Sequence, residues 1–434
     1  MSDQNIPVVK NDDQVAAYIA GEEQRERDGL ELIPSENYVS RDVLTALGSI
    51  FTNKYSEGYP KRRYYGGQEF TDKVEQLAID RAKELFHADH ANVQPHSGAP
   101  ANEAVYSAWL EPGDTVIAMD LSHGGHLTHG APVTRSAQLY NFVRYKMKDI
   151  STGEIDYEAL RALAIEHKPK IILAGFSAYP RELDYDKFAA IGNEVGALLM
   201  ADMAHVAGLI AGGVSENPLD HGFHVMTTTT HKSLRGPRGG LILSMGVVSN
   251  PLRAPEKTIE NIPTLIDRAI FPGMQGGPHE HTIAAKAVAF HEALQPSFKT
   301  YAAQVVKNAS VLADALTARG FQLITGGTSN HLILADVYKS FGIDGKVAEQ
   351  ALDAIGLTLN ANAVPDDTLP PFRPSGIRLG TPALTTRGLK EVHMEKIADW
   401  MKQAIDAHQN AERLIELRQE VSDFVQAFPL PSDQ

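Results

Sequence analysis

The sequence contains no cysteine among its 434 residues. This absence excludes disulfides, a thiol nucleophile and thiolate zinc sites, and it fits a reducing compartment. The chain also lacks an apolar run long enough to cross a bilayer, and its start, MSDQNIPVVKNDDQ, has neither the basic residues nor the apolar stretch of a signal peptide. We therefore expect a cytoplasmic protein without a membrane segment.

The chain also has fewer positively charged than negatively charged residues. The chain has 40 Lys and Arg against 54 Asp and Glu, a net charge of −14. A nucleic-acid site needs a concentrated cationic face, so we expect no nucleic-acid partner. Hydrophobic residues (43%) and charged residues (22%) are near the averages of folded proteins, and the length suggests two or three domains.

Short apolar runs rich in Val, Ile and Leu alternate with stretches of helical periodicity, which is typical of an α/β protein with a mainly parallel sheet. The predicted strands cover residues 115–119, 170–174, 197–202, 224–230 and 240–244. One predicted helix covers residues 71–88, with Thr71 as its cap. Its apolar face would contain Val74, Leu77, Ala78, Ala82 and Leu85.

Residues 245–278 are interrupted by Pro251, Pro255, Pro263 and Pro272, which predicts loops near a site. Helices at 282–294 and 301–319 and a strand at 331–337 follow, as in a smaller C-terminal α/β domain. We therefore divide the chain into an N-terminal arm (1–60), a large domain (61–290) and a small domain (291–434).

A carboxylate and a lysine follow two predicted strands. Asp202 ends the run 197–202, and His231 and Lys232 follow the run 224–230. Thirty residues separate Asp202 from Lys232, the length of about one strand–crossover–strand unit, so both are expected at neighbouring strand ends. A pyridoxal phosphate enzyme needs a lysine that binds the cofactor and a carboxylate against its pyridine nitrogen. Order and spacing favour this reading over a turn-capping aspartate and a solvated lysine.

Three further segments have candidate roles with ordinary alternatives. Residues 94–102 place the Ser97 hydroxyl and backbone N–H groups before a helix, which suits a phosphate or a plain helix cap. His126, within a histidine-rich segment, suits stacking on a flat cofactor or a core position; without a carboxylate or cysteine nearby in sequence, we expect no metal. The segment 55–65, with Glu57 and several tyrosines, suits an active-site loop or an interface.

The chain closely resembles the serine hydroxymethyltransferase family from about residue 15 to residue 425. The motifs are Asp202-Met-Ala-His205, Thr227 to Lys232, Arg235-Gly-Pro-Arg-Gly-Gly240, the Glu57/Tyr65 segment and Phe271-Pro-Gly-Met-Gln-Gly276-Gly277-Pro. The resemblance implies a fold type I pyridoxal phosphate transferase with a mainly parallel seven-stranded sheet in its large domain. It also implies reversible conversion of L-serine and tetrahydrofolate to glycine and 5,10-methylenetetrahydrofolate. The assembly would be a homodimer with shared active sites, or a tetramer built from it.

The resemblance also implies the site residues. Lys232 would carry pyridoxal phosphate covalently, and Glu57 of the partner subunit would transfer protons. The catalytic residues would be Lys232, Glu57, His231, His205, Thr229 and Tyr65. The cofactor-binding residues would be Ser97, Gly98, Ala99, His126, Ser177, Asp202, His205, Lys232, Tyr55, Gly276 and Gly277. The substrate-binding residues would be Ser35, Tyr65, Arg378 and Glu57, and the folate-binding residues Leu121, Gly125, His126, Leu127, Asn362, Pro370, Pro371 and Phe372.

Several positions depart from the family pattern. They are Pro34, Pro100, Ala361, Arg373-Pro374 and His279-Glu280-His281, together with a long loop at about 245–270. Because some border the expected folate groove, a folate-independent aldolase of threonine-type amino acids stays an alternative. Another reduced pterin or an α-methylserine substrate would use the same mechanism. A catalytically silent protein that binds partners or RNA fits poorly with an intact Lys232, Asp202 and Arg378.

Overall fold

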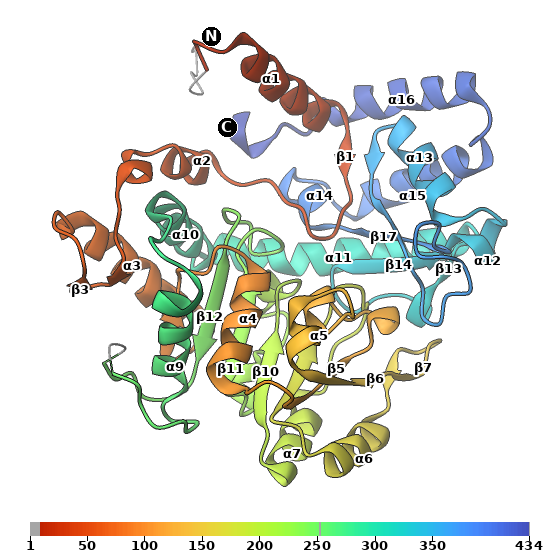
Figure 1. Ribbon diagram of the computed structural model, residues 1–434. Helices are drawn as coiled ribbons and strands as arrows, with labels where there is room; N and C mark the ends of the chain where they lie inside the picture. The colour runs from red at the N-terminus through yellow and green to blue at the C-terminus, as the bar shows by residue number, and fades with distance from the viewer. Residues whose placement is uncertain (1–8, 251–252, 434) are drawn as a thin grey trace.

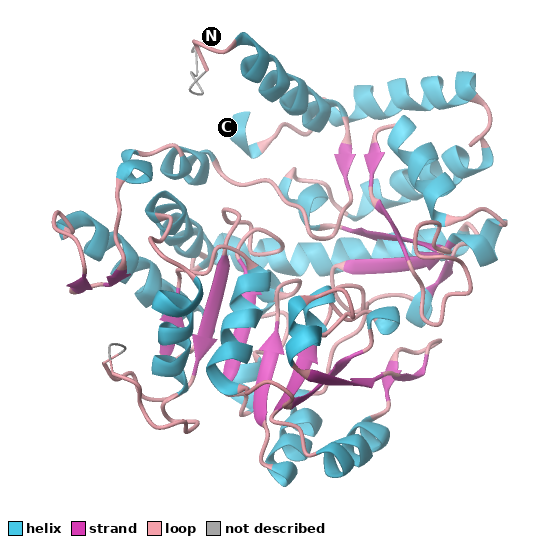
Figure 2. Ribbon diagram, in the orientation of Figure 1, coloured by secondary structure: helices cyan, strands magenta, loops and turns pink. Residues whose placement is uncertain are grey.

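The computed structural model describes residues 9–250 and 253–433, so the first eight residues of the N-terminal segment and Pro251 lie outside the described part. Its central element is a seven-stranded sheet (Figures 1 and 2). The strands, in spatial order, are β4 (His90–Asn92), β12 (Gly240–Ser244), β11 (Val225–Thr229), β10 (Leu198–Asp202), β9 (Ile171–Gly175), β5 (Thr115–Met119) and β6 (Asn141–Tyr145). Strand β12 runs antiparallel to both of its neighbours, and the other pairs are parallel. The predicted mainly parallel, seven-stranded sheet is confirmed.

Helices cover both faces of this sheet, which explains its nearly continuous apolar strands. In β10, Leu199 and Ala201 face one core, whereas Leu198 and Met200 face the other. The first core is closed by α3 (Glu69–Phe86), α6 (Tyr157–His167), α7 (Tyr185–Val195), α10 (Glu280–Ala293) and the start of α11 (Pro296–Ala318). The second is closed by α4 (Gly98–Trp109) and α9 (Ile262–Arg268).

A four-stranded antiparallel sheet lies in the C-terminal part of the chain. Its order is β13 (Gln322–Leu323), β14 (Leu332–Asp336), β17 (Gly376–Gly380) and β16 (Asn360–Asn362). Its core also contains residues of α13 (Gly345–Ala354), α15 (Glu391–Asp406) and α16 (Ala411–Val425). Helix α11, teal in Figure 1, supplies Val305 to the first core of the large sheet and Leu312 to this one. The domain boundaries at residues 60 and 290 stay predictions.

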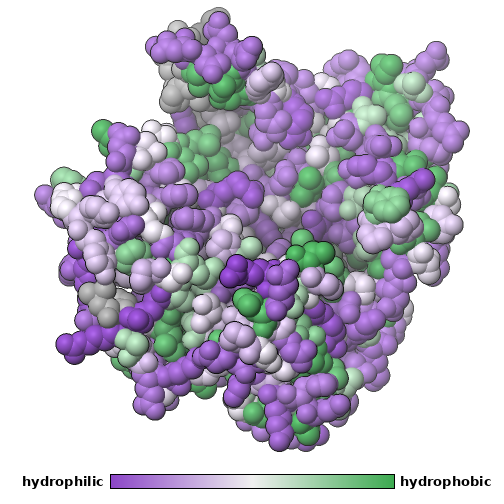
Figure 3. Space-filling model, viewed as in Figure 1, coloured by the Kyte–Doolittle hydropathy of each residue, from purple (hydrophilic) through white to green (hydrophobic). Residues whose placement is uncertain are grey.

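The N-terminal segment packs on the C-terminal part. Helix α1 (Asp13–Asp28) leads into β1 (Leu30–Glu31), which pairs in parallel with β15 (Leu357–Thr358). Every residue of α1 is exposed or half-exposed, and Tyr18 is 76% exposed. No helix within the described ranges is long and apolar enough to cross a membrane. The face seen in Figure 3 is mainly hydrophilic, with scattered apolar groups.

Element boundaries differ from the sequence prediction in a few places. Helix α3 begins at Glu69 rather than after a Thr71 cap, since acidic residues in a first turn favour a helix N-terminus, and Thr71 is buried within the helix. Leu77, predicted on the apolar face, is 42% exposed. Helix α11 begins five residues early because Pro296 suits a first helical position. The segment 245–278 contains α9 and an irregular helical stretch, η5 (Ala269–Met274), which is interrupted by the extended backbone of Phe271, in addition to loops.

Candidate active site

A cavity of about 230 Å³ lies at the carboxyl ends of β10 and β11 and the N-terminus of α4. It brings together side chains from segments more than 100 residues apart in sequence. The lining residues are Ser97, Gly98, Ala99, Asn102, His126, Phe176, Asp202, Ala204, His205, Thr229, His231, Lys232 and Arg238. Nine of these were predicted site residues. Asn102, Phe176, Ala204 and Arg238 were not.

Asp202 sits at one end of this cavity in a dense hydrogen-bond network. Its Oδ2 accepts from Asn102 Nδ2 at 2.8 Å and from His129 Nε2 at 3.0 Å, and its Oδ1 accepts from the Ala204 N–H at 3.1 Å. Burial alone would raise the pKa of Asp202, but His129, His126 and Asn102 hold it well below its usual range. Asp202 is therefore a buried carboxylate that stays ionised.

The same network orients His126 and His129. The backbone N–H of His126 donates to His129 Nδ1 at 3.2 Å, so the proton that His129 donates to Asp202 is on Nε2. Thr128 Oγ1 bonds both His126 Nδ1, at 2.7 Å, and Asn102, at 2.8 Å. Burial lowers the pKa of His126 to about 4, so its ring is neutral at pH 7.

The structure contradicts the expectation that no carboxylate lies near the histidine-rich segment. We expected no carboxylate beside the histidine segment, yet His126, His129 and Asp202 place their ligand atoms within 4.8 Å of one another. The fold supplies the carboxylate from β10, 73 residues further along the chain than His129. The His129–Asp202 contact has the geometry of a hydrogen bond, and Asn102 shares the same carboxylate oxygen.

Lys232 follows β11 and is half-buried in the cavity. Burial lowers its pKa to about 8; the Asp202 charge opposes the shift, while Arg378 and Arg238 add to it. His231 and His205 flank it, and burial lowers the pKa of both imidazoles, that of His231 to about 3. The lysine is thus a more available amine nucleophile than a surface lysine at neutral pH.

The other end of the cavity is the first turn of α4. Ser97 is its N-cap, and N–H groups of the first turn, including those of Gly98 and Ala99, lack partners within the helix. A Cβ on Gly98 would lie 2.8 Å from Thr229 Cγ2, so glycine is required for this close approach. A helix N-terminus of this kind suits a phosphate group. Lys232, the Asp202 carboxylate and the N-terminus of α4 together form a site that fits pyridoxal phosphate.

Arg378, on β17, reaches this region from the C-terminal sheet. Its Nη1 donates to the Ser177 carbonyl at 2.8 Å and to Ser177 Oγ at 3.1 Å, and its Nε donates to Asn360 at 3.1 Å. Burial lowers its pKa to about 10, so it stays charged at neutral pH. The Ser35 segment lies close by, because the Gly380 N–H donates to the Leu32 carbonyl at 2.7 Å.

A second cluster of predicted residues lies apart from this cavity. Tyr55 Oη donates to Glu57 Oε1 at 3.2 Å, and the rings of Tyr55 and Tyr65 meet edge to face at 5.1 Å. Gly276 and Gly277 pack closely on Glu57 and Tyr55. Tyr55 is 55% exposed and Tyr65 49% exposed. The cluster thus presents a carboxyl group and phenols on the surface of the chain.

The predicted folate residues come from two loops that meet through Asp366. Asp366 pairs with His123 at 3.3 Å and with Lys146 at 2.9 Å, which joins the loop at 121–129 to the one at 362–372. Leu121 and Leu127 are about half-exposed, and Phe372 is 77% exposed. Gly125 and Asn362 belong to the same two loops, as do Pro370 and Pro371.

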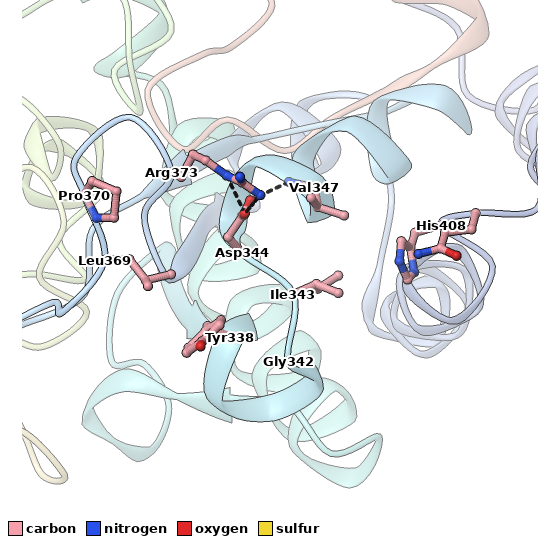
Figure 4. Close-up of a pocket in the computed structure, with 10 residues that line it drawn as sticks. Tyr338, Gly342, Ile343, Asp344, Val347, Leu369, Pro370, Arg373 and His408 are labelled. Atoms are coloured by element: carbon pink, nitrogen blue, oxygen red, sulfur yellow. Dashed lines mark hydrogen bonds and ion pairs between the residues drawn. The ribbon is translucent and has the colours of Figure 1, made fainter.

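Pro370 also lines a larger cavity, of about 640 Å³, on the C-terminal part (Figure 4). Arg373 and Asp344 pair there, with Arg373 Nε 2.8 Å from Asp344 Oδ2. Asp344 also caps α13 through the Val347 N–H. The two charges neutralise each other, and four of the six predicted catalytic residues line the smaller cavity instead, namely His205, Thr229, His231 and Lys232.

Fold and site together define a class, the fold type I pyridoxal phosphate-dependent transferases. A family model described as serine hydroxymethyltransferase matches residues 8–401. A protein of Koribacter versatilis (strain Ellin345) described as serine hydroxymethyltransferase is 52% identical over 421 residues, which cover 97% of this chain and 95% of that protein. The chain belongs to the serine hydroxymethyltransferase family.

Proposed function

We propose that this protein interconverts L-serine and glycine, with tetrahydrofolate as acceptor of the hydroxymethyl carbon and pyridoxal phosphate as cofactor. The observation that carries the proposal is the single cavity that contains Lys232, the ionised Asp202 and the N-terminus of α4. Bound pyridoxal phosphate supplies an electron sink for the bond broken at the α-carbon. The family relationship supports the same reaction.

The side chains of the cavity divide the work of holding the cofactor. In our proposal Lys232 would bind it covalently, Asp202 would keep its pyridine nitrogen protonated, and the neutral ring of His126 would stack on it. Ser97 and the first turn of α4 would hold the phosphate, whose charge suits a helix N-terminus.

Arg378 is proposed to bind the substrate carboxylate. Its planar guanidinium can form two parallel hydrogen bonds to a carboxylate, which fixes the amino acid relative to the cavity. In the structure the same group bonds Ser177, so substrate would exchange these bonds for its own. Ser35 is proposed to assist from the loop after β1.

Glu57 and Tyr55 are proposed to act in the active site of a partner subunit in a homodimer. Their support is geometric: they form an exposed cluster apart from the cavity of their own chain. Mixing inactive Lys232→Ala with inactive Glu57→Gln subunits tests this, because mixed dimers would regain one intact site. A mixture as inactive as its components would contradict shared sites.

Leu121, Leu127, Asn362 and Phe372 are proposed to contact the folate, since they lie on the two loops that Asp366 joins. We also propose the cytoplasm as the compartment, which rests on the sequence argument given first. Cell fractionation with an antibody to the protein tests it, and recovery in a membrane or secreted fraction would contradict it.

The assignment of Lys232 can be tested by reducing the purified protein with borohydride and mapping the pyridoxyl label by peptide mass. We expect the label on the peptide that contains Lys232. Lys232→Ala should abolish the reducible cofactor, whereas the exposed control Lys73→Ala should leave it unchanged. A Lys232→Ala protein that keeps a reducible cofactor would show that another lysine binds it.

A further inference from the structure

Ser56 is buried although its neighbours are not. Tyr55 is exposed and Glu57 is half-exposed, whereas Ser56 is 0% exposed. Ser56 Oγ donates to Glu280 Oε1 at 2.6 Å. Glu280 starts α10 and belongs to the His279-Glu280-His281 segment that departs from the family pattern. This bond therefore anchors the segment of Tyr55 and Glu57 to α10.

Glu280 belongs to a buried set of charged groups. Its neighbour Glu75, on α3, accepts from Arg63 Nη2 at 2.6 Å and from Gln94 Nε2 at 2.7 Å. Arg63 also pairs with Asp72 at 2.9 Å and approaches Glu280 only to 3.9 Å. The side chains of Arg63, Glu75 and Glu280 are 3%, 0% and 0% exposed.

The charges of this set do not balance if every carboxyl group is ionised. The two cations Arg63 and Lys286 would face the three carboxylates of Asp72, Glu75 and Glu280, and an uncompensated buried carboxylate is costly. Glu280 Oε2 has no hydrogen-bond donor among the described residues, and Arg63 lies 2.6 Å from Glu75 and 3.9 Å from Glu280, so the two carboxyl groups share one guanidinium. A proton on Glu280 supplies the missing donor and removes the excess charge.

Gln94 connects this set to the cofactor cavity. Its Nε2 donates to Glu75 and also to the Gly58 carbonyl at 2.8 Å, and it lies three residues before Ser97. Lys286, also on α10, holds the same loop through the carbonyls of Val93 and Pro95, at 2.6 and 3.2 Å. The set thus touches both the Tyr55–Glu57 segment and the loop that leads to α4.

We propose that Ser56, Arg63, Glu75, Gln94 and Glu280 form one positioning network, with a proton shared between Glu75 and Glu280, that fixes the Tyr55–Glu57 segment relative to the Ser97 loop. The proposal rests on the proposed function, in which α4 holds a phosphate of its own active site and Tyr55 serves that of the partner. The network would then hold the Ser97 loop, which serves the chain's own active site, in a fixed position relative to Tyr55, which serves the partner's active site. These five residues would act through others rather than touch substrate.

The proton has a measurable consequence. Burial and the charge of Glu75 raise the pKa of Glu280 to about 8, with Arg63 opposing the shift. The charged groups that face Glu280 are Arg63 and Glu75; Asp72 pairs with Arg63, Lys286 interacts with Glu75, and His279 and His281 are the chain neighbours of Glu280. The folded state holds this proton more tightly than the unfolded chain, so its contribution to stability is full at low pH and is lost as pH rises through about 8.

Glu280→Gln tests the proton, because an amide mimics the neutral acid: it donates to Glu75 and accepts from Ser56. We expect the melting temperature of the holoenzyme variant to exceed that of wild type by a margin that grows between pH 5 and pH 8, by about 2 °C or more, and then stays constant to pH 9. Glu292→Gln, which removes a carboxyl group elsewhere on α10, is the control and should show no such rise. A melting-temperature difference for Glu280→Gln that is constant with pH would overturn the shared proton.

Ser56→Ala tests the positioning. Cofactor-free protein should bind pyridoxal phosphate about tenfold more weakly after loss of this buried bond, but bind pyridoxal, which lacks the phosphate, as before. Ser40→Ala breaks a similar bond, from Ser40 Oγ to Glu292 at 2.5 Å on the same helix, and should change neither affinity. Equal affinities in Ser56→Ala and wild type, or equal weakening for both ligands, would overturn the network. Failure of wild type to bind pyridoxal phosphate would instead contradict the proposed function.

Discussion

The lowered pKa of Lys232 predicts how fast the cofactor-free protein captures pyridoxal phosphate. Only the neutral amine attacks an aldehyde, so the rate should rise with pH and level off above the pKa of this lysine. With a pKa of about 8 in place of 10.5, half of Lys232 is neutral at pH 8. An ordinary lysine would then be only about 0.3% neutral, so the expected advantage is roughly 150-fold.

Two substitutions with opposite effects make this prediction specific. The Asp202 charge raises the pKa of Lys232 and the Arg238 charge lowers it, while burial is the largest cause. Asp202→Asn should therefore move the midpoint of the pH–rate curve below that of wild type, and Arg238→Gln should move it above. Stopped-flow absorbance between pH 6 and 11 measures each curve. A wild-type midpoint near 10.5, or midpoints of both variants that shift in the same direction, would refute the reasoning.

Three further predictions concern other groups. Arg378→Lys, which removes the planar fork, should raise KM for L-serine about tenfold or more while the cofactor absorbance stays unchanged; loss of cofactor would contradict a substrate role. Glu57→Gln should lower folate-dependent glycine formation by about 100-fold more than cleavage of a threonine analogue, and equal losses would count against its proton-transfer role. Lys286→Met removes three buried hydrogen bonds to the carbonyls of Val93, Pro95 and Gly240, of which Pro95 keeps the Gly240 N–H, and should lower the free energy of unfolding by about 3 kcal/mol, measured in urea; a loss below about 1 kcal/mol would contradict this.

Five of the seven strands of the large sheet could be predicted from sequence because helices cover both of their faces, whereas the two edge strands, β4 and the largely half-exposed β6, were not predicted. Residues 115–119 and 240–244 were predicted with the observed bounds. The antiparallel direction of β12 could not be predicted, since a strand buried on both faces has the same apolar pattern in either direction. The spacing of Asp202 and Lys232 was, however, enough to predict that the ends of β10 and β11 are neighbours.

The partners of Asp202 could not be predicted from local pattern. Asn102 lies one turn into α4 and His129 follows a glycine-rich loop, and only the folded chain brings both to the same carboxylate oxygen. The Ser56–Glu280 bond joins residues 224 positions apart for the same reason. Sequence spacing indicates neighbouring strand ends, but it carries no signal for side chains that converge from a helix and a loop.

The central claim is hydroxymethyl transfer to tetrahydrofolate. Its most direct test is glycine formation from L-serine by the purified protein loaded with pyridoxal phosphate, measured with and without tetrahydrofolate. The account predicts rapid glycine formation that depends strongly on tetrahydrofolate. A rate indifferent to tetrahydrofolate would contradict it and would favour a folate-independent aldolase or another pterin acceptor.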